Sequence, residues 1–255
     1  KILFQLLENY CISRSTSTWF LNKEDAHYFE NNNKVNTHTS LGIGCPTSNF
    51  NPNHFSKEQK QSLRSKLGIS NENFIFIFVG RQVAHKGFSS IVKAFVRLNA
   101  INSNCKLLLV GTRDSIHPTG LTKEDEKVFL THSNILQIGW QKYVQPYLSI
   151  SDVIVFPSMR EGVPVCLMEA LTMGVPAITL NSRGCRDVVR NEIDGLIINE
   201  GSPDSVLNAM QRLMNNSKEL QNFAYRAKID SNRFDRGHYV KEQLKIYYQL
   251  YQLID

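Results

Sequence analysis

The fold of this chain is decided by one continuous apolar run, Phe74-Ile75-Phe76-Ile77-Phe78-Val79, which ends at Gly80. A run of aromatic and β-branched residues with no polar position is typical of a strand that is buried on both faces. Residues 90–99 follow it with apolar side chains at helical spacing. The two segments together predict one strand–helix unit of a parallel sheet.

The same alternation continues downstream as far as residue 200. We expect strand 106–110, helix 122–132, strand 134–138, strand 153–156, helix 165–173, strand 177–180 and strand 196–198. Strands and helices that alternate with short connections are typical of a parallel sheet covered on both sides. The predicted fold class is therefore α/β, a Rossmann-like parallel sheet with helices on both faces.

Open sheets of this kind bind ligands outside the carboxyl ends of their strands. The first strand is followed by Gly80-Arg81 and Lys86-Gly87, and glycine-rich or polar residues follow the other strands, at Gly111, 139–140, 158–162 and 181–184. The sequence therefore places its candidate ligand residues at one edge of the sheet.

The most informative segment spans residues 160–170. Pro164 is expected in the first turn of a helix, where its missing N–H costs nothing. The next N–H groups would then face Glu161 and Gly162, as in an anion site at a helix N-terminus. Glu169 lies on the same helix face as Val165, so the carboxylates of Glu161 and Glu169 would both line one ligand. The alternative stays open: a surface carboxylate at Glu169, and a Glu161 that only stabilises the helix dipole.

Arg81 and Lys86 both lie in the loop after the first strand. A guanidinium and an ammonium can together neutralise a diphosphate, the first by paired hydrogen bonds and the second as a point charge. A single arginine at a strand end is more often a solvated charge. Two cations beside a helix N-terminus favour a phosphate-bearing ligand instead.

Composition and motifs exclude several other functions. The net charge of +6 is dispersed, with no run of five Lys or Arg, which favours a solvated basic surface over a nucleic-acid face. The chain has no G-x-G-x-x-G, no phosphate-binding loop of ATPases, and no H-E-x-x-H or D-x-D, so no dehydrogenase, P-loop ATPase or metal site is expected. The five cysteines form no C-x-x-C pair, which suits a reducing cytosol.

No segment of the sequence is apolar over 18 residues, and the beginning of the chain does not resemble a secretory leader. A cytoplasmic protein is expected on these grounds. Residues 239–253 carry a stripe of apolar and aromatic side chains that predicts a terminal amphipathic helix. We interpret the aromatic residues of this stripe as packing residues rather than ligand contacts.

In order and spacing, residues 70–235 resemble the C-terminal, donor-binding domain of GT-B glycosyltransferases, and more narrowly the retaining group 1 (family four) transferases. The resemblance rests on 78–81, Lys86-Gly87, Gly139-Trp140, 151–153, Pro157-Ser158, Glu161-x7-Glu169, 174–176 and Asp194-Gly195. It implies the C-terminal half of a GT-B fold and an enzyme of the hexosyltransferase type.

The resemblance also implies roles for the phosphate and sugar ligands. Arg81 and Lys86, beside Gly80, would hold the donor diphosphate and stabilise charge on the leaving group. Glu161 would contact hydroxyls of the donor sugar. Backbone N–H groups of Gly162, Val163 and Val165 would assist it.

On the nucleoside side, the resemblance implies that Glu169 accepts hydrogen bonds from the ribose hydroxyls. Ile138 and Gly139 would border the base. The implied enzyme needs no metal and no cofactor, and its donor substrate is a UDP-sugar or another nucleotide sugar. Nucleic acid is not among the expected partners.

The resemblance divides the chain into three parts. Residues 1–66 would be a remnant of the acceptor-side domain with the interdomain linker, 67–235 the nucleotide-sugar-binding domain and 236–255 a crossover helix. Because so little of the acceptor-side domain is present, we expect the isolated chain to be a weak catalyst or an inactive one. The Gly44-Cys45-Pro46 linker also departs from the Gly-Val-Asp pattern that is common in the family.

Residues 183–187 are similar to those of transferases that build capsular or lipid-linked polysaccharides. This similarity implies a saccharide or lipid-linked acceptor. The family's lipid-linked acceptors and the net charge of +6 together predict a peripheral contact with the inner face of a membrane. Two alternatives stay open beside the transferase: a non-catalytic nucleotide-sugar-binding module and a sugar-nucleotide epimerase of the GT-B fold. The Glu161-x7-Glu169 spacing favours the transferase over the epimerase.

Overall fold

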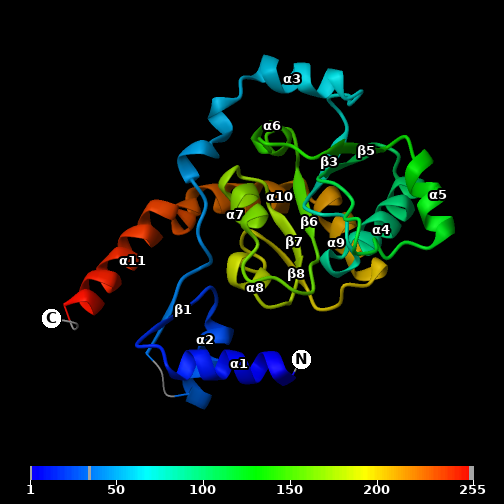
Figure 1. Cartoon of the computed structure of the whole chain (residues 1–255). Helices are drawn as coiled ribbons and strands as arrows, with labels where there is room; N and C mark the ends of the chain where they lie inside the picture. The colour runs from blue at the N-terminus through cyan, green and yellow to red at the C-terminus, as the bar shows by residue number, and fades with distance from the viewer. Residues whose placement is uncertain (1, 34–35, 253–255) are drawn as a thin grey trace.

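A computed structural model describes residues 2–33 and 36–252 of the chain. Its main feature is a parallel sheet of six strands in the order β5-β4-β3-β6-β7-β8 (Figure 1). These strands are β3 (Phe74–Val79), β4 (Cys105–Val110), β5 (Ile135–Gly139), β6 (Val153–Phe156), β7 (Ala177–Leu180) and β8 (Gly195–Ile198). The chain order reverses beside β3, which lies between β4 and β6, and this reversal marks the place where open sheets bind ligands.

The helices of the large sheet are α4 (Phe88–Ile101), α5 (Lys123–Thr131), α6 (Gln145–Leu148), α7 (Val165–Thr172), α8 (Cys185–Val188), α9 (Pro203–Asn215) and α10 (Ser217–Ile229). Helix α4 packs on α9, whereas α7 contacts β6, β7 and α10. Every residue of β6 and β7 is buried. Because successive side chains of a strand point to opposite faces, helices must cover both faces of the sheet there. The α/β prediction is confirmed.

The predicted elements of the sheet are present, with ends that differ by a few residues. Helix α4 begins two residues before the predicted segment and ends two after it. Pro164 precedes the first helical residue of α7 instead of lying in its first turn, and it adopts an extended conformation there. Helix α5 begins with a capping box, in which Thr122 and Asp125 each accept a backbone N–H of the other.

The N-terminal part of the chain forms a separate small layer. It contains α1 (Ile2–Ser13), β1 (Thr18–Phe20), α2 (Lys23–Asn33) and β2 (Thr37–Thr39), and β1 pairs with β2 in parallel. Its buried apolar residues form their own cluster. A linker with α3 (Lys57–Lys66) then leads to the large sheet. In Figure 1 the small layer lies beyond α8, away from α3. The division into three parts at residues 66 and 235 stays a prediction.

Helix α11 (Arg236–Tyr251) corrects one interpretation from the sequence. It forms as predicted, but its aromatic stripe is not packed: Tyr247, Tyr248 and Tyr251 are between 64% and 68% exposed. The predicted helix ran to Leu253, which lies outside the described residues. The helix points away from the large sheet, so these rings lack the neighbours that the amphipathic pattern anticipates (Figure 1).

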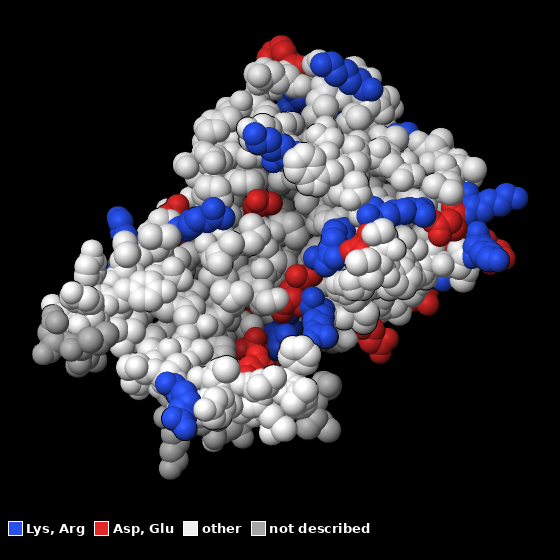
Figure 2. Space-filling model, in the orientation of Figure 1, with Lys and Arg blue, Asp and Glu red and all other residues white. Residues whose placement is uncertain are grey.

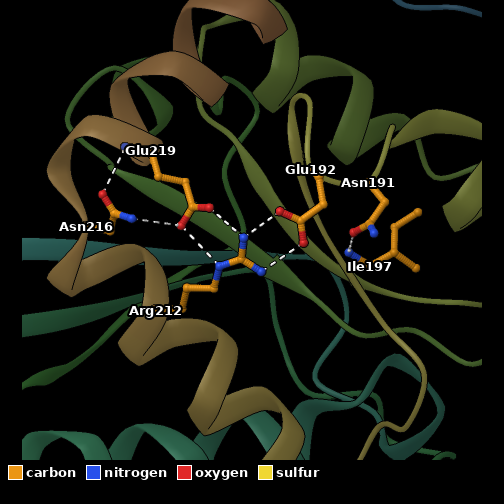
Figure 3. Close-up of polar contacts among 6 residues, drawn as sticks. All are labelled: Asn191, Glu192, Ile197, Arg212, Asn216 and Glu219. Carbon is orange, nitrogen blue, oxygen red and sulfur yellow. Dashed lines mark hydrogen bonds and ion pairs between the residues drawn. The ribbon is translucent and has the colours of Figure 1, made fainter.

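The far edge of the sheet is closed by polar contacts. Asn191 Oδ1 accepts the backbone N–H of Ile197 at 2.7 Å, which occupies a donor of the edge strand β8. Beside it, the Arg212 guanidinium pairs with both Glu192 and Glu219 and so connects α9 to the turn before β8 and to α10 (Figure 3). These pairs are exposed, so each contributes little to stability.

Candidate functional site

Four basic side chains converge on one hollow at the carboxyl edge of the sheet. This phosphate hollow, of about 520 Å³, is lined by Arg81, His85, Lys86, His117, Arg160, Glu161, Gly162 and Arg183. Figure 2 shows basic and acidic side chains gathered between the N-terminal helices and the sheet. The loops after β3, β6 and β7 all contribute to the hollow, as expected from the topology.

Lys86 and Glu161 form the innermost pair of the phosphate hollow. Lys86 Nζ lies 2.8 Å from Glu161 Oε1, and each side chain is 16% exposed. The same carboxylate oxygen accepts a hydrogen bond from Ser158 Oγ at 2.8 Å. Lys86 Nζ also lies 4.9 Å from the centre of the Phe156 ring. The ammonium is thus held at a fixed position with one carboxylate as its partner.

The turn that carries Lys86 depends on the glycine after it. Gly87 adopts a left-handed conformation, and a Cβ atom there would lie 2.6 Å from the carbonyl oxygen of Pro157. The backbone of this turn can therefore approach the loop after β6 only if residue 87 is glycine. The contact brings Lys86 and Glu161 together from two different strands.

Arg81 lies on the outer rim, where it pairs with Asp114 from the loop after β4. The backbone N–H groups of Ile116 and His117 donate to Asp114 Oδ1. These hydrogen bonds, together with His117 and Arg81, hold the pKa of Asp114 far below its ordinary value. The carboxylate is therefore ionised at all working pH values, and it positions Arg81, which is 54% exposed.

Two histidine rings complete the rim of the hollow. The rings of His85 and His117 meet edge to face at 6.2 Å. Burial lowers the pKa of His85, and the charges of Lys86 and Arg81 lower it further. We therefore expect a neutral His85 at pH 7, so this ring adds no positive charge to the hollow.

The loop at Glu161 and Gly162 is fixed from two sides. A Cβ atom at Gly184 would lie 2.5 Å from the carbonyl oxygen of Gly162, so the loop after β7 packs directly on this backbone. From the N-terminal layer, Asn22 Nδ2 donates to the same oxygen at 3.4 Å. Elements distant in the sequence thus determine where the loop at the start of α7 lies.

Glu169 lies one turn further along α7 and does not line the phosphate hollow. Burial raises the pKa of its carboxyl to about 7, although the charge of Arg236 opposes the shift. Val163 and Val165 are half-buried and pack against the core beside it. A carboxyl group with such a pKa titrates near neutrality, which is a common property of functional sites.

The predicted base-contacting residues lie at the end of β5, outside the phosphate hollow. Gly139 has a φ of 77°, so it turns the chain away from the sheet after Ile138. Gly80 directly follows β3, and a Cβ atom there would lie 3.6 Å from the Lys86 side chain. The structure thus brings together Arg81, Lys86, Glu161 and Gly162. The predicted nucleoside contacts lie outside this hollow, Ile138 and Gly139 at the end of β5 and Glu169 in α7.

Sequence reasoning did not assign Arg160, Arg183, Asp114 and His117 to the site. The first two had a usable signal, because they follow strands at the predicted ligand edge. Asp114 and His117 lie in an irregular segment with no motif, and only the folded loop places them against Arg81. Among the residues that the structure describes, no three His, Cys, Asp or Glu side chains are grouped as metal ligands; metal independence stays a prediction.

The sequence of the chain matches one known protein family. The model of the family "Glycosyl transferases group 1" matches residues 59–230, about two thirds of the chain. The chain belongs to the group 1 glycosyltransferases. The matched range contains the large sheet, the phosphate hollow's loops and Glu169, and it leaves out the N-terminal layer and α11.

The curated relatives of this group 1 chain include two sugar transferases from Escherichia and Campylobacter species. One is the Escherichia coli UDP-Gal:alpha-D-GlcNAc-diphosphoundecaprenol alpha-1,3-galactosyltransferase, 30% identical over 60% of this chain and 40% of its own length. The other is the Campylobacter jejuni N,N'-diacetylbacillosaminyl-diphospho-undecaprenol alpha-1,3-N-acetylgalactosaminyltransferase, 25% identical over 89% of this chain and 59% of its own. The chain thus spans about half the length of the curated relatives it matches.

The fold is shared with solved structures as well. The crystal structure of Anabaena Alr3699/HepE in complex with UDP and glucose superimposes with a TM-score of 0.78 and 16% sequence identity. The match covers 92% of this chain and 63% of that one. At this identity the likeness shows the GT-B type of fold alone.

Proposed function

We propose that this chain is the donor-binding half of a retaining glycosyltransferase that transfers a sugar from a UDP-sugar to a polysaccharide or lipid-linked acceptor. The observation that carries the proposal is the convergence of Arg81, Lys86 and Glu161 on one hollow at the ligand edge of a group 1 fold. The names of two relatives include a diphosphoundecaprenol-linked acceptor, and HepE was solved with UDP.

The proposed reaction uses these side chains on a leaving group. The bond between the sugar's anomeric carbon and the diphosphate oxygen breaks, and its electron pair stays on the diphosphate. The acceptor hydroxyl forms the new bond and gives up its proton to the departing phosphate. Lys86 and Arg81 stabilise the negative charge that develops there. Glu161, released from Lys86, accepts hydrogen bonds from the donor sugar, and Glu169 accepts them from the ribose.

A calorimetric titration of the chain with UDP, without added metal, tests the donor site. We expect saturable binding that Arg81→Ala weakens and that Arg97→Ala leaves unchanged. Arg97 is a matched control because it is also an exposed arginine paired with a carboxylate, Asp204, but lies on α4 away from the hollow. No binding of UDP, GDP or ADP would contradict the proposal.

Transfer assays then separate the alternatives. Turnover of a UDP-sugar with added acceptor supports the transferase. Tight UDP-sugar binding without turnover supports the nucleotide-sugar-binding module, and conversion of one UDP-sugar to its epimer supports the epimerase.

The carboxyl of Glu169 predicts a pH dependence of donor binding. With a pKa of about 7 it is mostly protonated at pH 6 and mostly ionised at pH 8. Because two ribose hydroxyls donate best to a carboxylate, the affinity for UDP-glucose should rise about tenfold between these pH values and level off above them. Glu169→Gln should remove this rise. An equal rise in wild type and Glu169→Gln would show that Glu169 is not its cause.

The place of action remains part of the proposal. We expect it in the cytoplasm, with a peripheral contact at the inner face of a membrane. Helix α1 exposes Leu3, Leu6 and Leu7, and α11 exposes its tyrosines, which supports such a contact. No helix in the described part of the chain is long and apolar enough to cross a membrane. Cosedimentation with anionic vesicles at low salt tests the contact, and its absence would exclude it.

A further inference from the structure

A second hollow lies directly beside the phosphate hollow. This outer hollow, of about 540 Å³, is walled by α1 and α2 on one side and by Arg160 and Arg183 on the other. Both arginines also line the phosphate hollow. Their side chains are thus the partition between two cavities, and a group held between them touches both.

Arg160 and Arg183 are not needed to neutralise a donor diphosphate in the phosphate hollow. A donor diphosphate requires cations, and Lys86 and Arg81 are the two that lie with the loops after β3. Lys86 is held by Glu161, and Arg81 is held by Asp114. Arg160 makes no ion pair or side-chain hydrogen bond with any residue in 2–33 or 36–252. It is an arginine with five donors facing two cavities and no protein acceptor.

Arg183, like Lys86 and Arg81, is held in position by a carboxylate. Its Nη1 lies 2.5 Å from Asp25 Oδ1, and the partner carboxylate receives a second hydrogen bond from Asn22 Nδ2 at 2.8 Å. Asp25 therefore fixes the guanidinium at the partition, as Asp114 fixes Arg81. The neighbouring Glu24 is paired with Arg186, so two of the acids of α2 are neutralised. Glu8 of α1 lines the opposite wall of the outer hollow.

The outer hollow also offers flat apolar surfaces. Phe4, Phe20 and Phe29 line it beside the acidic and amide groups of α1 and α2. Aromatic faces together with a few polar groups are suited to a sugar ring, which has apolar faces and a polar rim. The cavity thus combines a surface for a saccharide with a cationic end that faces the donor.

We propose that Arg160 and Arg183 form the binding site for the diphosphate of the acceptor, so that the acceptor class is a saccharide linked through a diphosphate. This inference rests on the proposed function. The attacking hydroxyl must reach the donor's anomeric carbon, so the acceptor sugar lies at the partition of the two hollows. In a sugar joined to its carrier through a diphosphate, that diphosphate lies within one ring of the attacking hydroxyl. Two guanidiniums at the partition are therefore in reach of it.

The test measures acceptor binding with the donor site already filled. The chain is saturated with UDP and titrated with N-acetylglucosamine linked through a diphosphate to a farnesyl chain. The same sugar as an uncharged octyl glycoside, and farnesyl diphosphate without sugar, serve as comparison ligands. The variants are Arg160→Ala, Arg183→Ala and their combination, with Arg97→Ala as the control.

We expect the diphosphate-linked sugar to bind more tightly than both comparison ligands. Arg160→Ala should weaken this binding at least tenfold, and the double variant at least 100-fold. Both variants should weaken UDP binding by a much smaller factor, because Lys86 and Arg81 still face the donor diphosphate. Arg160 is the sharper variant, because it has no protein partner to lose.

Three results would overturn the inference. The first is an uncharged glycoside that binds as well as the diphosphate-linked sugar, and the second is the absence of acceptor binding. The third is a loss of UDP affinity in Arg160→Ala that equals the loss for the acceptor, which would make the arginine a donor ligand. Failure of wild type to bind UDP would be seen in the first titration, and it would count against the proposed function separately.

Discussion

Lys86→Ala is expected to weaken UDP binding at least 100-fold, a loss of about 2.7 kcal/mol. The ammonium is one of two cations that face the proposed diphosphate from the loops after β3, and it is the deeper one, with 16% of its side chain exposed. A water molecule that fills the space of the missing ammonium carries no positive charge to stabilise the diphosphate. The substitution also leaves the Glu161 carboxylate without its cation, so that a second negative charge faces the diphosphate.

Glu161→Gln distinguishes the role of Glu161 from that of its partner Lys86. The glutamine still accepts from Ser158 but no longer attracts Lys86, so UDP alone should bind as well as in wild type or better. Transfer or hydrolysis of a UDP-sugar should fall, because the donor sugar loses its carboxylate. Calorimetry with UDP measures the first effect. Lys93→Ala is the control for Lys86→Ala, since Lys93 is an ion-paired lysine of α4 that does not line the phosphate hollow. Equal UDP affinity in Lys86→Ala and Lys93→Ala would exclude Lys86 as a phosphate ligand.

The order of the large sheet's elements could be predicted because its strands are buried. Runs such as residues 74–79 and 153–156 carry no polar position, and glycine or proline ends each of them. The local sequence alone therefore predicts that these strands are buried on both faces. The ends of α4 and the place of Pro164 were less accurate, because capping depends on contacts that the periodic pattern does not contain.

The candidate site could be predicted only as far as the topology determines it. The rule that ligands bind at the carboxyl edge brought Arg81, Lys86 and Glu161 to one place. The partners of these side chains could not be predicted in this way, because Asp114 lies in an irregular loop and Asp25 in another layer. The interpretation of α11 was wrong for a related reason: periodicity reports which face is apolar, but not what covers it.

Asp194→Ala is expected to destabilise the chain by about 3–5 kcal/mol, the largest effect on folding that we predict. The Asp194 side chain is fully buried in front of β8. Its carboxylate accepts from Arg190 Nε at 2.7 Å and from Arg233 Nη2 at 2.8 Å, and Oδ1 accepts the backbone N–H of Arg190. Removing it leaves the half-buried Arg233 guanidinium without its carboxylate partner and Arg190 with Asp230 alone.

The Asp194-Gly195 motif belongs to the family resemblance, so this variant also decides whether its role is structural or functional. Thermal unfolding should shift downward by about 10 °C for a chain of this size. Arg212→Ala, which removes the exposed pair with Glu192 and Glu219, should cost less than about 1 kcal/mol. Because Asp194 precedes its strand, it lies at the edge opposite the phosphate hollow, and UDP affinity below the unfolding transition should stay unchanged. A variant that unfolds like wild type but no longer binds UDP would make Asp194 a residue of the site.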